Sequence, residues 1–384
     1  MRLARRLDTI PPYLFAELDR KIEERRAAGV DVISLAVGDP DLPTPPHVVE
    51  ALQESASDPS THRYPSYYGM PELRRAIAGW YERRFGVDLD PETEVQPLIG
   101  SKEGIAHLPL AVLDSGDEAL VADPGYPVYE VATRLAGGKP IPLPLSSDRE
   151  WLADLGSAKV SQATKMLWLN YPNNPTAAVA EPAFFDEAVA FAKAHELLLA
   201  HDAAYTELTY EGFVAPSALQ SAGAKDVVIE FGSASKTYNM TGWRIGWAVG
   251  NAGAIRALAT IKTNIDSGIF GAVQRATIAA LEGPQDHLEE MRAVYQKRRD
   301  VVVGALHALG WDLEAPRGSI YVWFPTRDGA GSTEFAALLL DRAGVVVSPG
   351  NGYGPGGEGY CRISLTIADD RLGLAMERIR EALE

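Results

Sequence analysis

The sequence predicts an α/β protein in which a large domain with a mainly parallel sheet, flanked by helices, is joined to a smaller α+β domain. From about residue 90 to 250, short apolar runs alternate with longer segments of helical periodicity, as in strands connected by helices. After about residue 285 a long amphipathic stretch leads into a different order of strands and helices. We therefore expect an N-terminal arm that shares the small domain (1–45), a large domain (46–284) and a small domain (285–384).

The composition narrows the classes of function. The chain has 384 residues, of which 46% are hydrophobic, and its 36 Lys and Arg against 52 Asp and Glu give a net charge of −16. Such an acidic protein is a poor candidate for binding nucleic acid or an anionic membrane surface. The single cysteine, Cys361, excludes an intrachain disulfide and favours the cytoplasm. No apolar run approaches the ~20 residues that a membrane helix needs. We expect no metal site.

The N-terminal part of the sequence predicts a helix, then a strand and a turn. Apolar residues from Tyr13 onward recur at helical spacing. A strand follows over 32–37 and ends in a turn that begins at Gly38 and is rich in Pro and Asp. Taken alone, this pattern fits a plain proline-rich turn, and its spacing does not exclude that interpretation.

Two helices, 47–56 and 71–85, flank a segment with three tyrosines that include Tyr64. These tyrosines suit packing in a core or an interface as well as a binding role. Next, a short strand ends at 98–99, and Ser101 and Lys102 lie in a turn that opens a helix to residue 113. Free N–H groups and the helix dipole make such a turn an anion site, although Ser101 could also act as a simple cap.

Polar residues follow several of the predicted strands. Tyr126 comes shortly after the strand 119–122, Asn174 follows 167–169, and Asp202 and Tyr205 follow 197–200. Open α/β sheets bind ligands at the carboxyl ends of their strands, so these residues are candidates for one site. Taken alone, Asp202 would fit a helix cap equally well.

The segment between the last two predicted strands of the large domain, 227–231 and 245–249, carries the most distinctive chemistry. Its order is Ser233-Ala234-Ser235-Lys236 and then Gly242-Trp243-Arg244-Ile245-Gly246. Arginine and hydroxyl groups can hold a phosphate, while a neighbouring cation and partial burial lower the pKa of a lysine that attacks a carbonyl. Phosphate binding next to a Schiff-base lysine points to pyridoxal phosphate. An ordinary loop with one exposed lysine is the alternative.

This segment resembles the lysine signature of the class I/II, fold type I aminotransferases, S-x-S-K followed by G-x-R-x-G, and further family motifs recur in order over nearly the whole chain. The resemblance implies that Lys236 forms the Schiff base, that Asp202 pairs with the pyridine nitrogen and that Tyr126 stacks on the ring. The cofactor residues it implies are Ser101, Lys102, Tyr126, Asn174, Asp202, Tyr205, Ser233, Lys236, Arg244 and Tyr64. For substrate it implies Gly38, Tyr13, Asn174 and Arg362.

The resemblance also implies partners and a reaction. Such enzymes are homodimers in which Tyr64 would reach the other subunit's cofactor phosphate, and they move an amino group between an amino acid and a 2-oxo acid. A pyridoxal phosphate lyase would use the same residues. A regulator with this fold would need a DNA-binding extension, for which the chain has neither room nor basic charge.

Four segments resemble the branch of the family that acts on LL-diaminopimelate with 2-oxoglutarate, and two features depart from the patterns. The four segments are 12–15, 100–105, 123–129 and 264–268. The loop 65–69 lacks the carboxylate that we expect in that branch, which leaves aspartate, alanine, aromatic and succinyldiaminopimelate donors open. The Gly that usually follows the Asn-Pro motif is Ala177 here.

Overall fold

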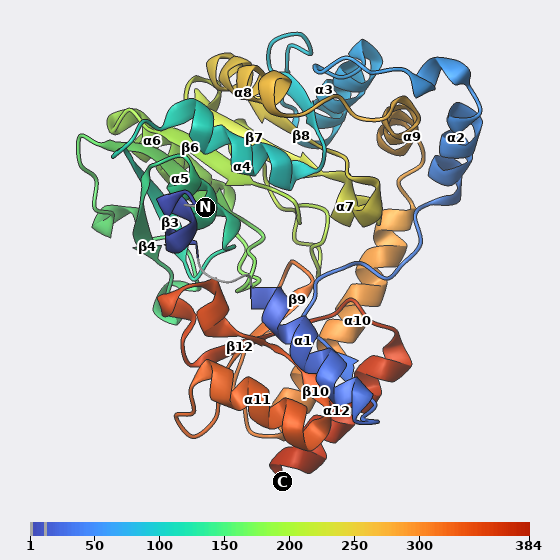
Figure 1. The fold of residues 1–384 in the computed structure, drawn as a ribbon, viewed down its shortest axis with the longest axis vertical. Helices are drawn as coiled ribbons and strands as arrows, with labels where there is room; N and C mark the ends of the chain where they lie inside the picture. Colours follow the sequence, from blue (N-terminus) through green and yellow to red (C-terminus); the bar gives the residue numbers. More distant parts are fainter. Residues whose placement is uncertain (1–2, 11–13) are drawn as a thin grey trace.

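The structure is a computed structural model that describes residues 3–10 and 14–384 (Figure 1). Within these ranges the main sheet has seven strands in the order β2-β8-β7-β6-β5-β3-β4. Strands β3 to β7 are parallel, whereas β8 is antiparallel to both of its neighbours. The prediction of a mainly parallel sheet is therefore confirmed. The bounds are β2 Val95–Leu98, β3 Glu118–Asp123, β4 Lys139–Pro144, β5 Thr164–Asn170, β6 Leu198–Asp202, β7 Val228–Ser233 and β8 Gly246–Gly250.

Helices cover both faces of this sheet, because successive strand side chains point to opposite sides. Met166, Trp168 and Phe231 pack with α4 (Ser101–Val112), α5 (Val128–Leu135) and α8 (Ala252–Ile265). Leu167 and Leu199 pack on the other face, whose helices are α3 (Pro71–Phe85), α6 (Pro182–Ala194) and α9 (Gly271–Glu282). Helix α2 (Pro46–Ala56) lies beside α9. None of the described helices combines the length and the apolar character needed to cross a membrane.

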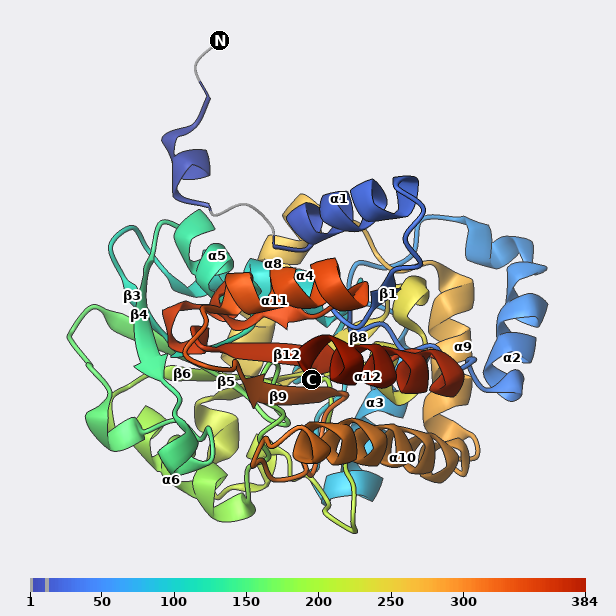
Figure 2. The same cartoon turned by 90° about the horizontal axis from the view of Figure 1, so that it is seen from below.

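A smaller layer contains the sheet β11-β12-β9, which is antiparallel and lies below the large sheet in Figure 1. Figure 2 shows α10, α11 and α12 around β9 and β12. Near these elements, β1 pairs in parallel with β10 and so brings the N-terminal part of the chain to the C-terminal part. The bounds are α1 Leu14–Ala27, β1 Ile33–Ser34, α10 His287–Ala308, β9 Tyr321–Pro325, α11 Ser332–Ala343, β10 Val345–Val346, β11 Ser348–Pro349, β12 Tyr360–Ser364 and α12 Asp369–Leu383.

Two strands, β1 and β4, differ from the prediction. The predicted strand 32–37 is only β1, because its partner β10 pairs with it over two residues. Strand β4 was not predicted. It lies at the edge of the large sheet and contains Pro140, Pro142 and Pro144, and proline within an apolar run argues against a central strand. Pairing with β3 on one side is enough to hold this edge strand.

Cys361 lies in β12 and is fully buried in the apolar core of the small layer. Burial raises the pKa of its thiol to about 12. The thiol therefore stays protonated and packs as a small apolar side chain.

Candidate active site

A cavity of about 390 Å³ lies between the carboxyl ends of the large parallel sheet and the strands β9 and β12. Asn170, Asp202 and Ser233 line it and are the last residues of β5, β6 and β7. The crevice rule for α/β sheets therefore locates this site. The predicted site residues that line the cavity are Gly38, Ser101, Lys102, Tyr126, Asn174, Asp202, Tyr205, Ser233, Lys236, Arg244 and Arg362.

Lys236 follows β7 on the short helix α7 (Ala234–Thr237), and its Nζ donates a hydrogen bond to the carbonyl oxygen of Gly38 at 2.7 Å. The pKa of the Lys236 amine is lowered to about 8, chiefly by burial, with the charge of Asp39 opposing this shift and the charges of Arg362 and Arg244 adding to it. A sizeable fraction of the amine is thus uncharged near neutral pH. An uncharged amine in a cavity can attack a carbonyl carbon.

Asp202 is a buried carboxylate with ordered partners. Its Oδ2 accepts from the hydroxyl of Tyr129 at 2.8 Å, and its Oδ1 accepts from the Ala204 N–H at 3.3 Å. The Asn170 amide donates to the Asp202 carbonyl at 2.7 Å, which ties the ends of β5 and β6 together. Burial raises the pKa of Asp202, whereas the Tyr129 bond, the charge of His201 and the Ala204 bond lower it. A carboxylate in this position can pair with a cationic ring nitrogen.

A second group of cavity residues supplies hydrogen-bond donors for an anion. Ser101 and Lys102 stand in the first turn of α4, while Ser233 and Arg244 come from the ends of the segment that holds Lys236. Burial and the nearby charge of Arg244 lower the pKa of Lys102. Hydroxyls, a guanidinium and a helix N-terminus are the groups that bind phosphate in proteins.

Two glycines explain why this part of the site is so compact. A Cβ on Gly100 would lie 2.3 Å from Nη2 of Arg244, and one on Gly246 would lie 2.6 Å from the backbone nitrogen of Ser101. Gly100 also has φ of +75°, which favours glycine. Arg244 itself has φ of +55°, an uncommon conformation for a residue with a side chain that often marks a functional position. Gly246, the last glycine of the G-x-R-x-G motif, therefore lets the start of β8 lie against the first turn of α4.

Arg362 of β12 is held on several sides. Its Nη1 donates to Oδ1 of Asn174 at 2.6 Å, and its Nη2 donates to the carbonyl of Ala36. The guanidinium carbon lies 3.9 Å from the ring centre of Tyr321 and 4.9 Å from that of Tyr353. A planar guanidinium fixed between aromatic rings is suited to bidentate recognition of a carboxylate.

The turn after β5 keeps Asn174 at the cavity despite the departure at Ala177. The backbone N–H of Asn174 donates to Oδ1 of Asn170 at 2.8 Å. Ala177 adopts φ of +61°, the left-handed conformation that the usual glycine would take easily. The substitution therefore costs backbone strain but leaves the turn in place.

Three tyrosines that line the cavity were not assigned a role from the sequence. Tyr129 follows Tyr126 by three residues, and a second aromatic in that motif was the available signal. Tyr321 and Tyr353 come from the small layer, and the Tyr321 hydroxyl lies 3.1 Å from that of Tyr205. Nothing in their local sequence separates these two tyrosines from ordinary core aromatics.

One predicted site residue among those described, Tyr64, does not line the cavity of this chain. Tyr64 is 93% exposed and belongs to an exposed group with Tyr67 and Tyr68. Tyr13 lies outside the described residues. The role expected of Tyr64 would need a second subunit.

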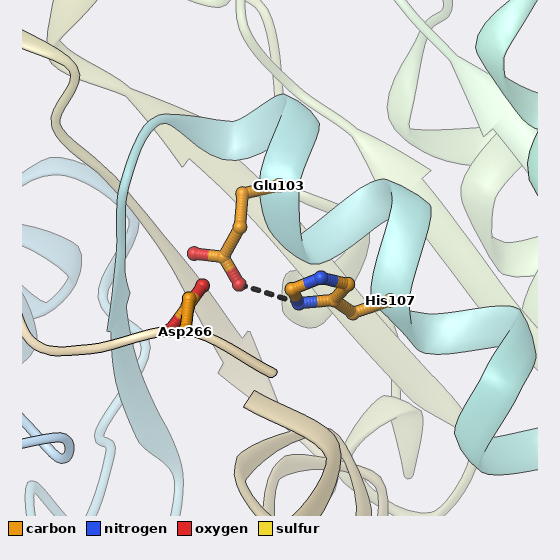
Figure 3. Close-up of side chains that lie close together, drawn as sticks. All are labelled: Glu103, His107 and Asp266. Atoms are coloured by element: carbon orange, nitrogen blue, oxygen red, sulfur yellow. Dashed lines mark hydrogen bonds and ion pairs between the residues drawn. The ribbon is translucent and has the colours of Figure 1, made fainter. Parts of the chain in front are cut away.

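A partly buried polar cluster anchors the first turn of α4 (Figure 3). Glu103 accepts from the Ile99 N–H at 2.9 Å and from Nζ of Lys262 at 3.0 Å, and it bonds Nδ1 of His107 at 2.8 Å. Lys262 also donates to Asp266 at 2.8 Å. Glu103, His107 and Asp266 are close enough to hold a metal ion, but the Lys262 ammonium already supplies the positive charge between the two carboxylates. The cluster therefore ties α4 to the end of α8 beside Ser101 and Lys102.

Pyridoxal phosphate brings a phosphate, an aldehyde carbon and a basic ring nitrogen, and the residues of this cavity offer a partner for each. The donors around Arg244 suit the phosphate, the Lys236 amine suits the aldehyde, and the Asp202 carboxylate suits the protonated nitrogen. This fold and this site define a pyridoxal phosphate-dependent enzyme of fold type I.

The chain belongs to the family described as aminotransferase class I and II, whose sequence model matches residues 30–379. It is 55% identical over 385 residues to the LL-diaminopimelate aminotransferase of Moorella thermoacetica, covering 100% of this chain and 99% of that protein. Substrate-bound BacF from Bacillus subtilis has a TM-score of 0.95 at 38% identity, covering 99% of this chain and 98% of that one. A probable N-succinyldiaminopimelate aminotransferase from Thermus thermophilus has a TM-score of 0.91 at 40% identity, covering 96% and 100%. The predicted family, fold class, enzymatic activity and cofactor are confirmed.

Proposed function

We propose that this aminotransferase moves an amino group between LL-diaminopimelate and 2-oxoglutarate. The observation that carries amino transfer is the meeting of Lys236, Asp202 and Arg362 in one cavity. The choice of substrate is supported by the relative from Moorella thermoacetica, which bears that name and matches over the full length of this chain. The four sequence segments typical of that branch support the same choice.

In this proposal the catalytic residues are Lys236, Asp202 and Tyr126. The cofactor, when bound, supplies a carbonyl that takes up the amino group and a cationic ring that withdraws electrons. Lys236 would hold the cofactor through its amine, and the free amine would remove the proton from the substrate Cα, a task that its lowered pKa favours. Asp202 and Tyr126 both line the cavity, where Asp202 would keep the ring nitrogen protonated and Tyr126 would hold the ring. The residues that would hold the cofactor are Ser101, Lys102, Tyr126, Asn174, Asp202, Tyr205, Ser233, Lys236, Arg244 and the partner subunit's Tyr64.

The same proposal assigns the α-carboxylate of the substrate to Arg362, with Asn174 and Gly38 beside it. The bond from Arg362 to Asn174 at 2.6 Å supports this, because it orients the guanidinium toward the cavity that both residues line. Gly38 has no space for a side chain, since a Cβ there would lie 2.0 Å from the Tyr321 hydroxyl. We retain Tyr13 as a further substrate contact from the sequence.

We propose a homodimer with shared active sites. Tyr64 and Tyr68 are more than half exposed, and Ile265 at the end of α8 and Phe270 in the segment that follows add exposed apolar surface. That segment packs on the tyrosine loop, because a Cβ on Gly268 would lie 2.3 Å from the carbonyl oxygen of Ser66. Covering this surface with a second copy would bury it and carry Tyr64 toward the other subunit's cofactor phosphate.

The division into 1–45, 46–284 and 285–384 and a cytoplasmic location are further parts of the proposal. Pairing of β1 with β10 supports assigning the N-terminal part to the small domain. Separate apolar cores under the large and the small sheet support two domains. The net charge of −16 supports small-molecule substrates rather than nucleic acid or membrane partners.

An alternative donor is favoured by one observation. Among the described residues, the carboxylate that lines the cavity is Asp202, and the loop 65–69 has no acidic residue. The second ammonium of LL-diaminopimelate would therefore lack a counter-charge in this chain, which is costly in a closed site. A succinylated amine or a simple amino acid such as aspartate, alanine or tyrosine carries no such group, so an aminotransferase for one of these is the second candidate.

Steady-state assays with 2-oxoglutarate as acceptor test the substrate. We expect the highest kcat/KM with LL-diaminopimelate, compared with its N-succinyl derivative, aspartate, alanine and tyrosine. The DD isomer of diaminopimelate is a matched control, because it has the same charges with inverted stereocentres. A kcat/KM for LL-diaminopimelate far below that of any other donor would refute the substrate while leaving amino transfer intact.

A further inference from the structure

A hydrogen bond between Tyr129 and Asp202 joins two parts of the chain that lie 73 residues apart. The Tyr129 hydroxyl donates to Oδ2 of Asp202 at 2.8 Å, and the two residues are only 1% and 5% exposed. Tyr129 stands on α5, outside the strand that carries Asp202. A bond between a hydroxyl and an ionised carboxylate is among the stronger hydrogen bonds, and burial strengthens it further.

The Tyr129 ring is held so that this hydroxyl keeps its direction. It stacks on Trp168, with ring centres 4.9 Å apart and an angle of 15° between the planes. Trp168 in turn stacks on Phe231 of β7 at 6.0 Å. The edge of Tyr129 meets Tyr126 at 5.7 Å and 81°. One rigid group of aromatic rings thus fixes both the cavity residue Tyr126 and the donor to Asp202.

The hydrogen bond from Tyr129 matters because Asp202 is buried. Its titratable neighbours are His201 on the same strand, Tyr205 on the following segment and Tyr129 from α5. Burial pushes the pKa of Asp202 upward, and the Tyr129 bond is the first of the interactions that oppose this. With Oδ2 engaged by Tyr129, the carboxylate also has a fixed orientation at the cavity wall.

We propose that Tyr129 is a positioning residue that keeps Asp202 ionised and oriented, so that the carboxylate can pair with the ring nitrogen of pyridoxal phosphate. The proposal rests on the proposed function, in which Asp202 faces that nitrogen. Tyr129 itself acts through Asp202.

The test compares two ligands on the full-length protein after removal of its cofactor. One ligand is pyridoxal phosphate, and the other is its carbon analogue, in which C–H replaces the ring nitrogen. The ratio of their dissociation constants, measured by titration between pH 5 and 9, gives the preference for the ring nitrogen. General damage to the cavity weakens both ligands and cancels in this ratio.

The expected result is a shift of the pH at which the preference is lost. Below the pKa of Asp202 the carboxylate carries a proton that must leave before it pairs with a cationic nitrogen, so the preference falls about tenfold per pH unit. Tyr129→Phe removes the donor that opposes the rise in this pKa. Its loss of preference should therefore begin at a higher pH, by about one unit. Tyr210→Phe, which removes another buried tyrosine hydroxyl, bonded to the Ser319 carbonyl, should behave as the parent.

Two results for Tyr129→Phe would overturn the proposal, and the variant Asp202→Asn tests the role of Asp202 separately. An unchanged pH dependence of the preference in Tyr129→Phe, or equal weakening of both ligands without a shift, would overturn the proposal. Asp202→Asn should lose the preference at every pH. If Asp202→Asn keeps it, the assignment of Asp202 in the proposed function fails, and that failure is distinct from the failure of Tyr129 alone.

Discussion

The free-amine fraction of Lys236 should determine how fast the cofactor-free protein takes up pyridoxal phosphate. Burial lowers the pKa of this lysine from 10.5 to about 8. At pH 7 about one chain in ten then carries the uncharged amine, roughly 300-fold more than an unperturbed lysine would give. Only the uncharged amine can bond with the aldehyde, so uptake should accelerate about tenfold per pH unit up to a midpoint near that pKa.

Substitution of Asp39 tests how a nearby charge changes the pKa of Lys236. This exposed carboxylate is the nearby charge that raises the Lys236 pKa, whereas Arg362 and Arg244 lower it. Asp39→Asn should therefore move the midpoint to lower pH and speed uptake at pH 7. Rapid-mixing absorbance of the lysine-bound cofactor measures the rate from pH 6 to 10. Comparison with the parent cancels the titration of the cofactor itself.

Asp312→Asn is the matched control, because Asp312 is also exposed but is not among the groups that perturb Lys236. Its profile should coincide with that of the parent. A parental midpoint near 10.5 would refute the reasoning, because burial would then not lower the pKa of the amine. A midpoint that rises in Asp39→Asn would also refute it, because Asp39 would then not raise that pKa.

Three further predictions follow from the proposed roles. Lys236→Ala should abolish turnover and the absorbance of the lysine-bound cofactor while the circular dichroism spectrum stays unchanged; parental turnover in the purified variant would remove Lys236 from the site. Asp202→Asn should lower kcat by several orders of magnitude with cofactor still bound, because a neutral amide cannot hold the pyridinium proton; activity within a few-fold of the parent would reduce Asp202 to a structural role. An equimolar mixture of Lys236→Ala and Tyr64→Phe chains that exchange subunits at random should recover about a quarter of the parental activity, because about half of the dimers are mixed and each of these has one site with both native residues; a fully active monomer in sedimentation would contradict the shared site.

The sequence alone determined the fold class and most of the site. Each run of apolar residues that became a strand of the parallel sheet ended in polar residues, and parallel strands bring their carboxyl ends to one edge. Asp202 and Ser233 could therefore be placed together without coordinates, and the serine and glycine pattern around Lys236 pointed to the cofactor. These are local signals, since each depends on residues that are neighbours along the chain.

The tertiary structure alone decided which side chains from distant segments complete the site. Tyr129 lies 73 residues from Asp202, and Tyr321 lies 116 residues from Tyr205, so no local pattern records either contact. The strand β4 escaped detection for a related reason, because its prolines oppose a strand locally and only pairing with β3 makes it one. The lowered pKa of Lys236 likewise arises from burial between two layers, and burial is a property of the folded chain rather than of the residue.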